Sequence, residues 1–176
     1  MWPPYSGGKR GFVSAVAGFS VPVVRPGVAV GSGASFVGAL RAGYAAGDLG
    51  FEPFVELGGN LVGPRALWVD AGARWMFSPT IKRGPDGVLG GVPFFIGPEL
   101  LLGTFVELPS GTEISGNEVY SAPASARFLG GLSLDLAFAL SPSFSLESQL
   151  GNLRWAPGGS GTLFFMGATV GATVRF

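Results

Sequence analysis

A strict two-residue alternation of side-chain character runs through the C-terminal part of this chain. Between Phe164 and Phe176 every second residue is apolar, and the positions between them are mostly Gly and Thr. Successive side chains of a β-strand point to opposite faces of a sheet, so this period is typical of a strand with one apolar face. The alternation therefore predicts a long strand at 161–176.

The same period recurs along the rest of the chain. In 127–140 one face consists of Leu, Phe and Gly, whereas Arg127 and Asp135 lie on the other face. In 92–107 the charged Glu99 likewise falls opposite an apolar face. The predicted strands are 11–23, 34–46, 49–58, 66–77, 92–107, 127–140, 143–155 and 161–176. An even set of about eight strands predicts an all-β fold, an antiparallel up-and-down barrel.

Glycine and proline exclude membrane-spanning helices. The longest uncharged run, Trp155–Val174, contains Pro157 and five glycines. Its apolar part begins at Leu163 and is shorter than the ~20 residues that a spanning helix needs. The N-terminal part lacks the arrangement of a secretory signal, so we interpret Met1 as the start of a mature domain from which any export signal is missing.

Composition decides where the apolar faces lie. Apolar residues make up 47% of the chain and charged residues only 12%, against about 25% charged residues in an ordinary soluble domain. A soluble lipocalin-like barrel would turn its charged face to water, and such a barrel or a sandwich is the alternative. The few charges and the Gly-, Ser- and Thr-rich polar faces favour a transmembrane barrel with its apolar faces in lipid and a narrow lumen. Eleven basic and eleven acidic residues cancel, so no nucleic-acid partner is expected.

The predicted connections alternate in length along the chain. Short turns at 47–48 and 141–142 fall at one end of the barrel, which we assign to the periplasm. The connections that we assign to the outside are 24–33, 59–65, 108–126 and 156–160. The 78–91 connection is too long for a periplasmic turn, so either it has a partner there or the strand count is wrong nearby. Residues 1–10 are predicted to be a flexible N-terminal lead-in, and 11–176 the transmembrane barrel.

The chemistry of several enzyme classes is missing. The chain has no His and no Cys, which excludes Ser-His-Asp and Cys-His catalytic groups and Cys/His zinc sites. Glu52 and Glu56 share a face, but four residues along a strand separate them by about 13 Å, too far for a retaining glycosidase pair. The glycine runs lack the Lys of a phosphate-binding loop. We therefore predict no enzymatic activity, no cofactor and no metal.

The charged residues of the polar faces should meet in the lumen. Buried charges must be paired, so we predict an ion-pair network there. Its members are Arg41, Glu52, Glu56, Asp70, Arg74, Glu99, Glu107, Arg127, Asp135, Glu147 and Arg175. The expected hairpin register pairs Glu107 with Arg127 at the rim and brings Glu99 and Asp135 together one level deeper, with Arg74 shared between them.

Two functions fit such a lumen. An eight-stranded barrel is just wide enough for its side chains to fill, which favours a structural or interaction module of the cell envelope. The alternative is a narrow pore for small solutes or ions, because the inward Gly and Ser residues leave room for water.

The closing stretch Gly167–Phe176 resembles the C-terminal strand of bacterial outer-membrane barrels. With the strand number and the alternation, the likeness extends over residues 11–176 toward small eight-stranded barrels of the OmpA and OmpX type. The resemblance implies a location in the bacterial outer membrane, among its lipids, and recognition by the barrel-assembly machinery. The signal for this recognition would be carried by Val170, Ala172, Val174 and Phe176, although the family often has an aromatic residue where this chain has Val174.

Three segments are candidate contacts for another envelope protein. The longest outer connection carries polar residues such as Glu113, Asn117, Glu118 and Tyr120. The 78–91 connection and the Pro- and aromatic-bearing N-terminus Trp2–Tyr5 are the other two. For the N-terminus, a disordered lead-in is the favoured interpretation.

Overall fold

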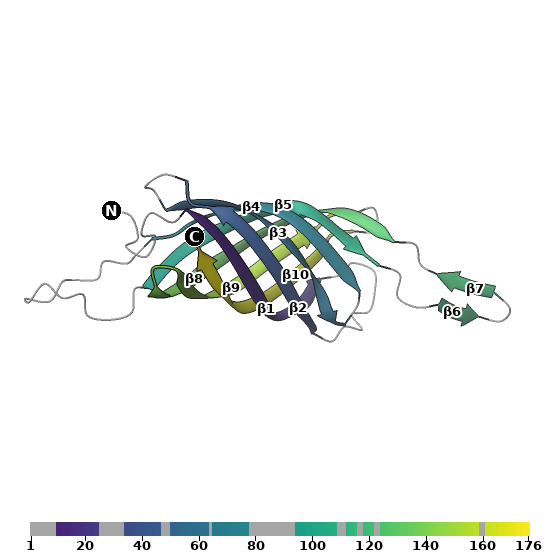
Figure 1. Cartoon of the computed structure of the whole chain (residues 1–176). Coiled ribbons are helices and arrows are strands. Elements are labelled where there is room, and N and C mark those ends of the chain that lie inside the picture. Colours follow the sequence, from purple (N-terminus) through teal and green to yellow (C-terminus); the bar gives the residue numbers. More distant parts are fainter. Residues whose placement is uncertain are drawn as a thin grey trace, which may run out of the picture.

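The computed structural model describes residues 10–24, 34–46, 50–63, 65–77, 94–108, 112–115, 118–121, 124–158 and 161–176. Eight strands close into an antiparallel barrel in the order β1-β10-β9-β8-β5-β4-β3-β2, and two short strands form a separate sheet (Figure 1). The barrel strands are β1 (Gly11–Val24), β2 (Ser35–Tyr44), β3 (Phe51–Val62), β4 (Ala66–Trp75), β5 (Phe94–Glu107), β8 (Ser125–Ser141), β9 (Phe144–Ala156) and β10 (Leu163–Arg175). Within the described ranges, no helix is long and apolar enough to cross a membrane.

The predicted fold is confirmed, with two local differences. Strand β3 continues to Val62, so the loop predicted at 59–65 shrinks to 63–65. Gly59, which the prediction placed in this loop, pairs with Leu67 of β4, and Gly58 at the end of the predicted strand pairs with Trp68. The connection predicted at 108–126 contains the hairpin of β6 (Thr112–Ser115) and β7 (Glu118–Ser121).

The strand directions define two ends of the barrel. At one end, here called the terminal end, β1 begins and β10 finishes, and Gly11 and Phe176 exchange two backbone hydrogen bonds of 3.1 and 3.0 Å. The tight connection between β8 and β9 lies at this end too. The opposite end, here called the loop end, carries the β6–β7 hairpin, which projects beyond the barrel wall in Figure 1. The predicted connections at 24–33, 47–48, 78–91 and 156–160 lie wholly or partly outside the described residues.

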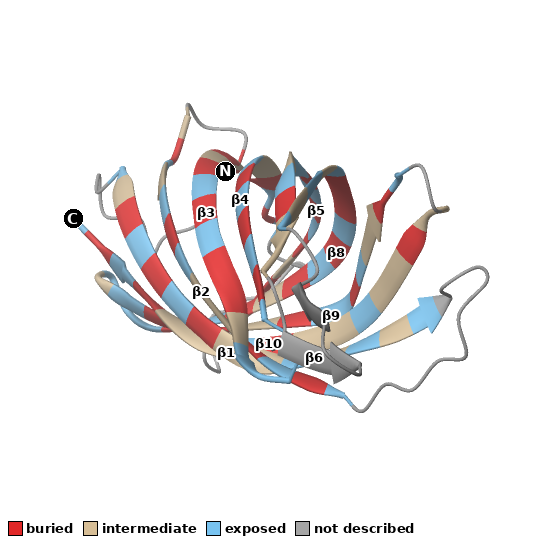
Figure 2. Ribbon diagram, turned by 90° about the vertical axis from the view of Figure 1, so that its right-hand side faces the viewer, coloured by how far each residue is buried: buried red, intermediate tan, exposed pale blue. Residues whose placement is uncertain are grey.

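The barrel is apolar outside and polar inside. Buried and exposed residues alternate along each strand (Figure 2), and the exposed ones include Leu40, Val55, Leu57 and Val170, with 57–65% of their surface open. A lipocalin-like soluble barrel has the opposite arrangement. Burying a Val, Leu or Phe side chain is worth about 1.5–3 kcal/mol, so this outer surface is stable only when it is covered by lipid.

Three apolar clusters also lie inside the barrel. The loop-end cluster surrounds Trp68, Phe105 and Leu129, and its other members are Val37, Ala66, Ala156 and Leu163. The terminal-end cluster consists of Met76, Phe95, Ala137 and Ala139. A third group, Phe12, Phe54 and Leu101, lies between the charged residues of the lumen. The lumen is therefore a packed core with apolar side chains near both of its ends.

Candidate functional site

The charged lumen is the candidate functional site. Nine of the sequence-predicted residues are at most 5% exposed there: Arg41, Glu52, Glu56, Asp70, Arg74, Glu99, Asp135, Glu147 and Arg175. Each occupies an inward position because its strand keeps the two-residue alternation. Glu107 and Arg127 are half-buried at the loop end.

Arg74 of β4 is the centre of the network near the terminal end. Its Nε donates to Glu52 Oε2 at 2.8 Å, and its two terminal nitrogens donate to both oxygens of Glu147 at 2.8 and 3.1 Å. Its Nη1 also lies 3.2 Å from Asp135 Oδ2. Glu52 is held in addition by Arg175, whose Nη1 and Nη2 donate to its two oxygens at 2.7 and 3.2 Å. These contacts connect strands from opposite sides of the barrel.

Arg41 of β2 is the centre of the middle layer. Its terminal nitrogens donate to Glu99 at 2.8 and 3.0 Å, and its Nε donates to Glu56 at 2.5 Å. Glu99 Oε1 also accepts hydrogen bonds from Ser133 at 3.1 Å and from Gln149 at 2.7 Å. Charge-assisted, bidentate contacts of this kind are the strong ones among protein hydrogen bonds.

Aromatic rings line the guanidinium groups as well. The guanidinium carbon of Arg41 lies 4.8 Å from the ring centroid of Phe54, and that of Arg74 lies 4.9 Å from the centroid of Phe12. Attraction between a cation and a ring face is strongest where water is excluded. Phe12 and Phe54 therefore fill the space around the cations with apolar atoms that still favour positive charge.

Arg154 of β9 belongs to the network, although the sequence analysis did not include it. Its Nη2 donates to Glu56 at 2.5 Å and its Nη1 to Asp70 at 3.2 Å. Strict alternation from Glu147 would place Arg154 on the lipid face. A β-bulge at Gly151, where φ is +62°, inserts one residue and returns Arg154 to the lumen. A glycine inside an otherwise regular strand pattern is the signal that could have revealed it.

Trp68 also takes part in the ion-pair network, although the two-residue alternation does not mark its indole as a polar group. Its indole Nε1 donates to Glu56 Oε1 at 2.7 Å, and its ring stacks on Arg154 with 4.8 Å between guanidinium carbon and centroid. On its other side, Trp68 belongs to the loop-end cluster. It therefore joins the charged layer to the apolar residues that cover it.

The detailed arrangement differs from the prediction in two respects. The register between β5 and β8 pairs Glu107 with Ser125 and Glu99 with Ser133, a shift of two residues from the expected pairing. Glu107 and Arg127 still approach each other diagonally, with 3.4 Å between Oε2 and Nη2. The cation shared by Glu99 and Asp135 is Arg41, at 2.8 and 3.8 Å, rather than Arg74. Arg74 contacts Asp135 but takes Glu52 and Glu147 as its other partners, because Glu52 is paired with it on the neighbouring strand β3 and Glu147 on β9 faces it across the lumen.

The carboxylate of Asp70 lies so close to the backbone of Gly103 that only a glycine fits there. Asp70 points toward Gly103 of the neighbouring strand β5, with which it is paired. A Cβ at Gly103 would overlap Asp70 Oδ1. The absence of a side chain at this position gives the carboxylate room beside Arg154.

The residues of the expected assembly signal lie on the outer face of β10. Val170, Val174 and Phe176 have 52–68% of their surface exposed, and Ala172 is half-buried. All four point away from the lumen, so they are open to lipid or to another protein. The side chains of Glu113, Asn117, Glu118 and Tyr120 lie outside the described part of the chain.

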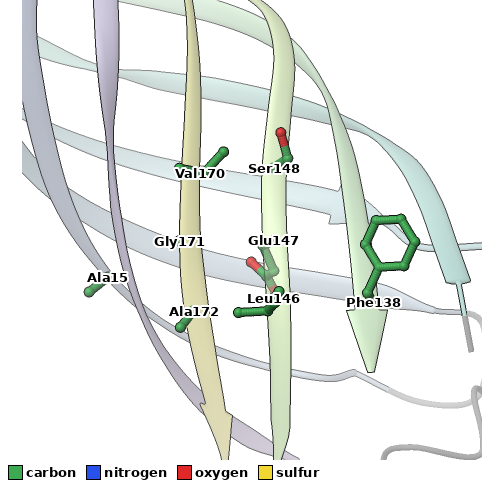
Figure 3. Close-up of a pocket in the computed structure, with 8 residues that line it drawn as sticks. All are labelled: Ala15, Phe138, Leu146, Glu147, Ser148, Val170, Gly171 and Ala172. Atoms are coloured by element: carbon green, nitrogen blue, oxygen red, sulfur yellow. The ribbon is translucent and has the colours of Figure 1, made fainter. Parts of the chain in front are cut away.

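The outer wall also carries a shallow groove of about 560 Å³ (Figure 3). It crosses β1, β10, β9 and β8, with the small residues Ala15, Gly171 and Ala172 on the β1 and β10 side and the larger Leu146 and Phe138 on the β9 and β8 side. Its side chains belong to the apolar outer face, apart from Ser148 and the inward-pointing Glu147. The groove therefore belongs to the lipid-facing surface.

No metal-binding cluster accompanies these features in the described residues. Among them, no group of three or more acidic side chains is placed to hold a metal ion. The carboxylates are instead occupied by guanidinium, amide, hydroxyl and indole groups, and so the lumen is best described as a set of ion pairs.

Comparison with solved structures finds small outer-membrane barrels. The structure of Neisserial surface protein A (NspA) has a TM-score of 0.62 at 16% identity, covering 94% of this chain and 97% of that chain. The N-terminal β-barrel domain of Pseudomonas aeruginosa OprF gives 0.53 at 14% identity, covering 94% and 97%. Ail, the attachment invasion locus protein of Yersinia pestis, in complex with the heparin analogue sucrose octasulfate, gives 0.50 at 12%, covering 96% and 99%.

Neither the scan against protein-family models nor the search of curated proteins gives a match. The likeness to NspA, OprF and Ail is one of fold, and it extends over nearly the whole chain. It agrees with the apolar belt and the polar lumen, which fit the same environment. The chain thus has the fold of the small eight-stranded barrels of bacterial outer membranes.

Proposed function

We propose that this chain is a non-enzymatic, integral outer-membrane barrel that acts as a structural or interaction module of the cell envelope, with a closed lumen. The observation that carries the proposal is the content of the lumen. Four arginines and six carboxylates form ion pairs across it, and apolar clusters lie on both sides of these pairs. Such a filling supports a closed barrel over the narrow pore, because the interior of an eight-stranded barrel is only wide enough for its side chains to fill.

Conductance across a planar lipid bilayer tests the closed lumen. We expect the refolded wild-type barrel to insert without steady current in symmetric salt. A known porin in the same bilayers controls for the recording conditions, and intrinsic fluorescence of the four tryptophans in vesicles controls for insertion. Reproducible single-channel steps from the inserted protein would favour the pore instead.

We further propose that the outer face of β10 is read by the barrel-assembly machinery. Support comes from the exposed row that ends in Phe176 and from its resemblance to C-terminal strands of outer-membrane barrels. We expect Phe176→Ala to slow assembly into vesicles that contain the assembly machinery, with little change in vesicles of lipid alone. Phe144→Ala, which removes an exposed ring at the same end of β9, is the matched control. Equal rates for both variants would contradict the proposal.

The domain boundaries follow the same proposal. Residues 11–176 would form the barrel and 1–10 its lead-in, although residues 1–9 lie outside the described part of the chain. Arg10, the last residue of the predicted lead-in, accepts a backbone hydrogen bond from Ala45 at 2.7 Å, so the lead-in would begin directly at the barrel rim. Other envelope proteins would be contacted through this segment, the 78–91 connection or the loop end.

A further inference from the structure

The charges inside the lumen do not balance. Among the described residues, the carboxylates that take part in the lumen network are Glu52, Glu56, Asp70, Glu99, Asp135 and Glu147. The guanidinium groups that face them are Arg41, Arg74, Arg154 and Arg175. Glu107 and Arg127 at the rim cancel each other. The carboxylates therefore exceed the cations by two, in a space where an uncompensated charge is costly.

The hydrogen bonds show which carboxylates carry the excess. Both oxygens of each of the four glutamates accept a hydrogen bond from a cation or a neutral donor, as the contacts of Glu52, Glu56, Glu99 and Glu147 show. The two aspartates differ. Asp70 Oδ1 and Asp135 Oδ1 are buried without a hydrogen-bond partner, although both side chains are at most 2% exposed. The number of carboxylates in excess over the guanidinium groups therefore equals the number of aspartates, Asp70 and Asp135, that have an oxygen without a hydrogen-bond partner.

Asp135 has an acceptor next to it. Glu99 and Asp135 lie diagonally opposite each other on the neighbouring strands β5 and β8, and Nη1 of Arg41 lies 2.8 Å from Glu99 Oε2 and 3.8 Å from Asp135 Oδ2. Both oxygens of Glu99 accept hydrogen bonds from Arg41, and Oε1 also accepts from Ser133 and Gln149, so Glu99 presents acceptors to its neighbours. Two ionised carboxyl groups in contact repel each other, and such pairs commonly share a proton. Asp70 Oδ1 instead faces Gly103, which offers no side-chain acceptor.

We propose that Glu99 and Asp135 form a proton-binding site in the lumen, in which Asp135 Oδ1 carries the proton and donates it to Glu99. The other oxygen of Asp135 keeps its contact with Arg74, and Glu99 keeps Arg41. The charged and polar groups around the pair come from every neighbouring inner face: Arg41 from β2, Glu52 and Glu56 from β3, Arg74 from β4, Ser133 from β8, and Glu147 and Gln149 from β9. Because no third acidic group is placed to hold a metal with the pair among the described residues, a proton fits the site better than a metal cation.

Isosteric substitutions test the proposal. Asparagine has the shape of a protonated aspartate, and its NH₂ group can donate to Glu99 while its oxygen accepts from Arg74. We expect Asp135→Asn to change the folding equilibrium constant at neutral pH by less than about twofold, because it replaces one neutral donor with another. The matched control Glu147→Gln removes an ionised partner of the same Arg74, and we expect a loss of more than about tenfold. An equal loss in both variants would overturn the proposal.

A direct measurement on the wild-type barrel does not depend on variant folding. Infrared spectra at neutral pH, in buffer with a chelator, should contain the carbonyl band of a protonated carboxyl group. The band should be weaker in Asp135→Asn than in the wild type, and the part that Asp135→Asn removes should disappear in the wild type as the pH is raised. A wild-type spectrum without this band would overturn the proposal. So would a stability that follows the concentration of sodium or magnesium at fixed pH, since a bound cation would then balance the charge.

Discussion

Individual arginines in this lumen have very different surroundings. Arg74 contacts three carboxylates and is fully buried. Arg127 contacts Glu107 at 3.4 Å, and 31% of the Glu107 side chain is exposed. Breaking a buried pair leaves an uncompensated charge, whereas a solvated pair is screened by water and salt. The same residue type should therefore matter in one place and hardly at all in the other.

We expect Arg74→Ala to cost about 3–5 kcal/mol of unfolding free energy, because it leaves Glu52, Asp135 and Glu147 without a shared cation. Arg127→Ala should cost at most about 1 kcal/mol. Urea unfolding in lipid vesicles, followed by tryptophan fluorescence, measures both. If the two substitutions prove equally mild, the buried network does not stabilise the barrel.

At the scale of strands, much of the architecture could be predicted because alternation is a local property. Each inward position in β3, β4 and β5 follows from its neighbours, so Glu52, Asp70 and Glu99 were placed in the lumen without knowledge of the fold. Register is not local. The β5–β8 pairing depends on a connection that folds into its own hairpin, and a two-residue shift leaves the faces unchanged. The pattern therefore had no means of distinguishing the two registers.

The partners across the lumen could not be predicted either. Arg74 on β4 meets Glu147 on β9, and Arg41 on β2 meets Glu99 on β5, in both cases three strands apart around the barrel. Such contacts depend on how the closed sheet is staggered, which no single strand encodes. The bulge at Gly151 adds a second difficulty, because one extra residue reverses the faces of everything that follows it in β9.

The bulge at Gly151 should be required to keep Arg154 of β9 in the lumen. Deleting Gly151 should restore strict alternation and turn Arg154 toward lipid. We expect a cost of about 3–5 kcal/mol from the loss of its contacts with Glu56 and Asp70, besides the cost of placing a charge on the lipid face. Gly151→Ala keeps the residue count and should cost only about 1–2 kcal/mol for a left-handed backbone. A deletion variant that refolds in vesicles as well as Gly151→Ala would contradict this role of the bulge.

On the outer face of β8, the cost of an arginine substitution should depend on how deep the residue lies in the membrane. Leu134 lies near the middle of this 17-residue strand, and Leu140 lies beside the turn at its terminal end; both side chains are exposed outside. Leu134→Arg should cost about 2–4 kcal/mol and Leu140→Arg about 0–1 kcal/mol, because the cost of a lipid-facing arginine falls toward the interface. Unfolding in vesicles gives both values. Equal costs would place this face outside the lipid.

At the scale of the whole molecule, apolar and charged side chains occupy separate parts of the barrel. Apolar side chains cover the outside, paired charges occupy the middle of the lumen, and apolar clusters lie near its two ends. The ion pairs are strong because water is kept from them. We expect the clusters around Trp68, Phe105 and Leu129 and around Phe95 to exclude this water, because they lie toward the two ends of the lumen.

The loop-end and terminal-end clusters can be removed together by substitution. Replacing Phe105, Leu129 and Phe95 by Ala removes large apolar side chains from both ends of the lumen without touching a charge. We expect water to enter and a steady current to appear in planar bilayers where the wild type has none. The current should favour cations, because carboxylates outnumber guanidinium groups in the described lumen and rings of acidic groups select cations. The control replaces Leu102, Leu132 and Phe138 by Ala, which removes a similar volume from the outer face. This variant should give no steady current. If the lumen variant folds and is silent too, the ion pairs alone close the barrel and the apolar clusters have no sealing role.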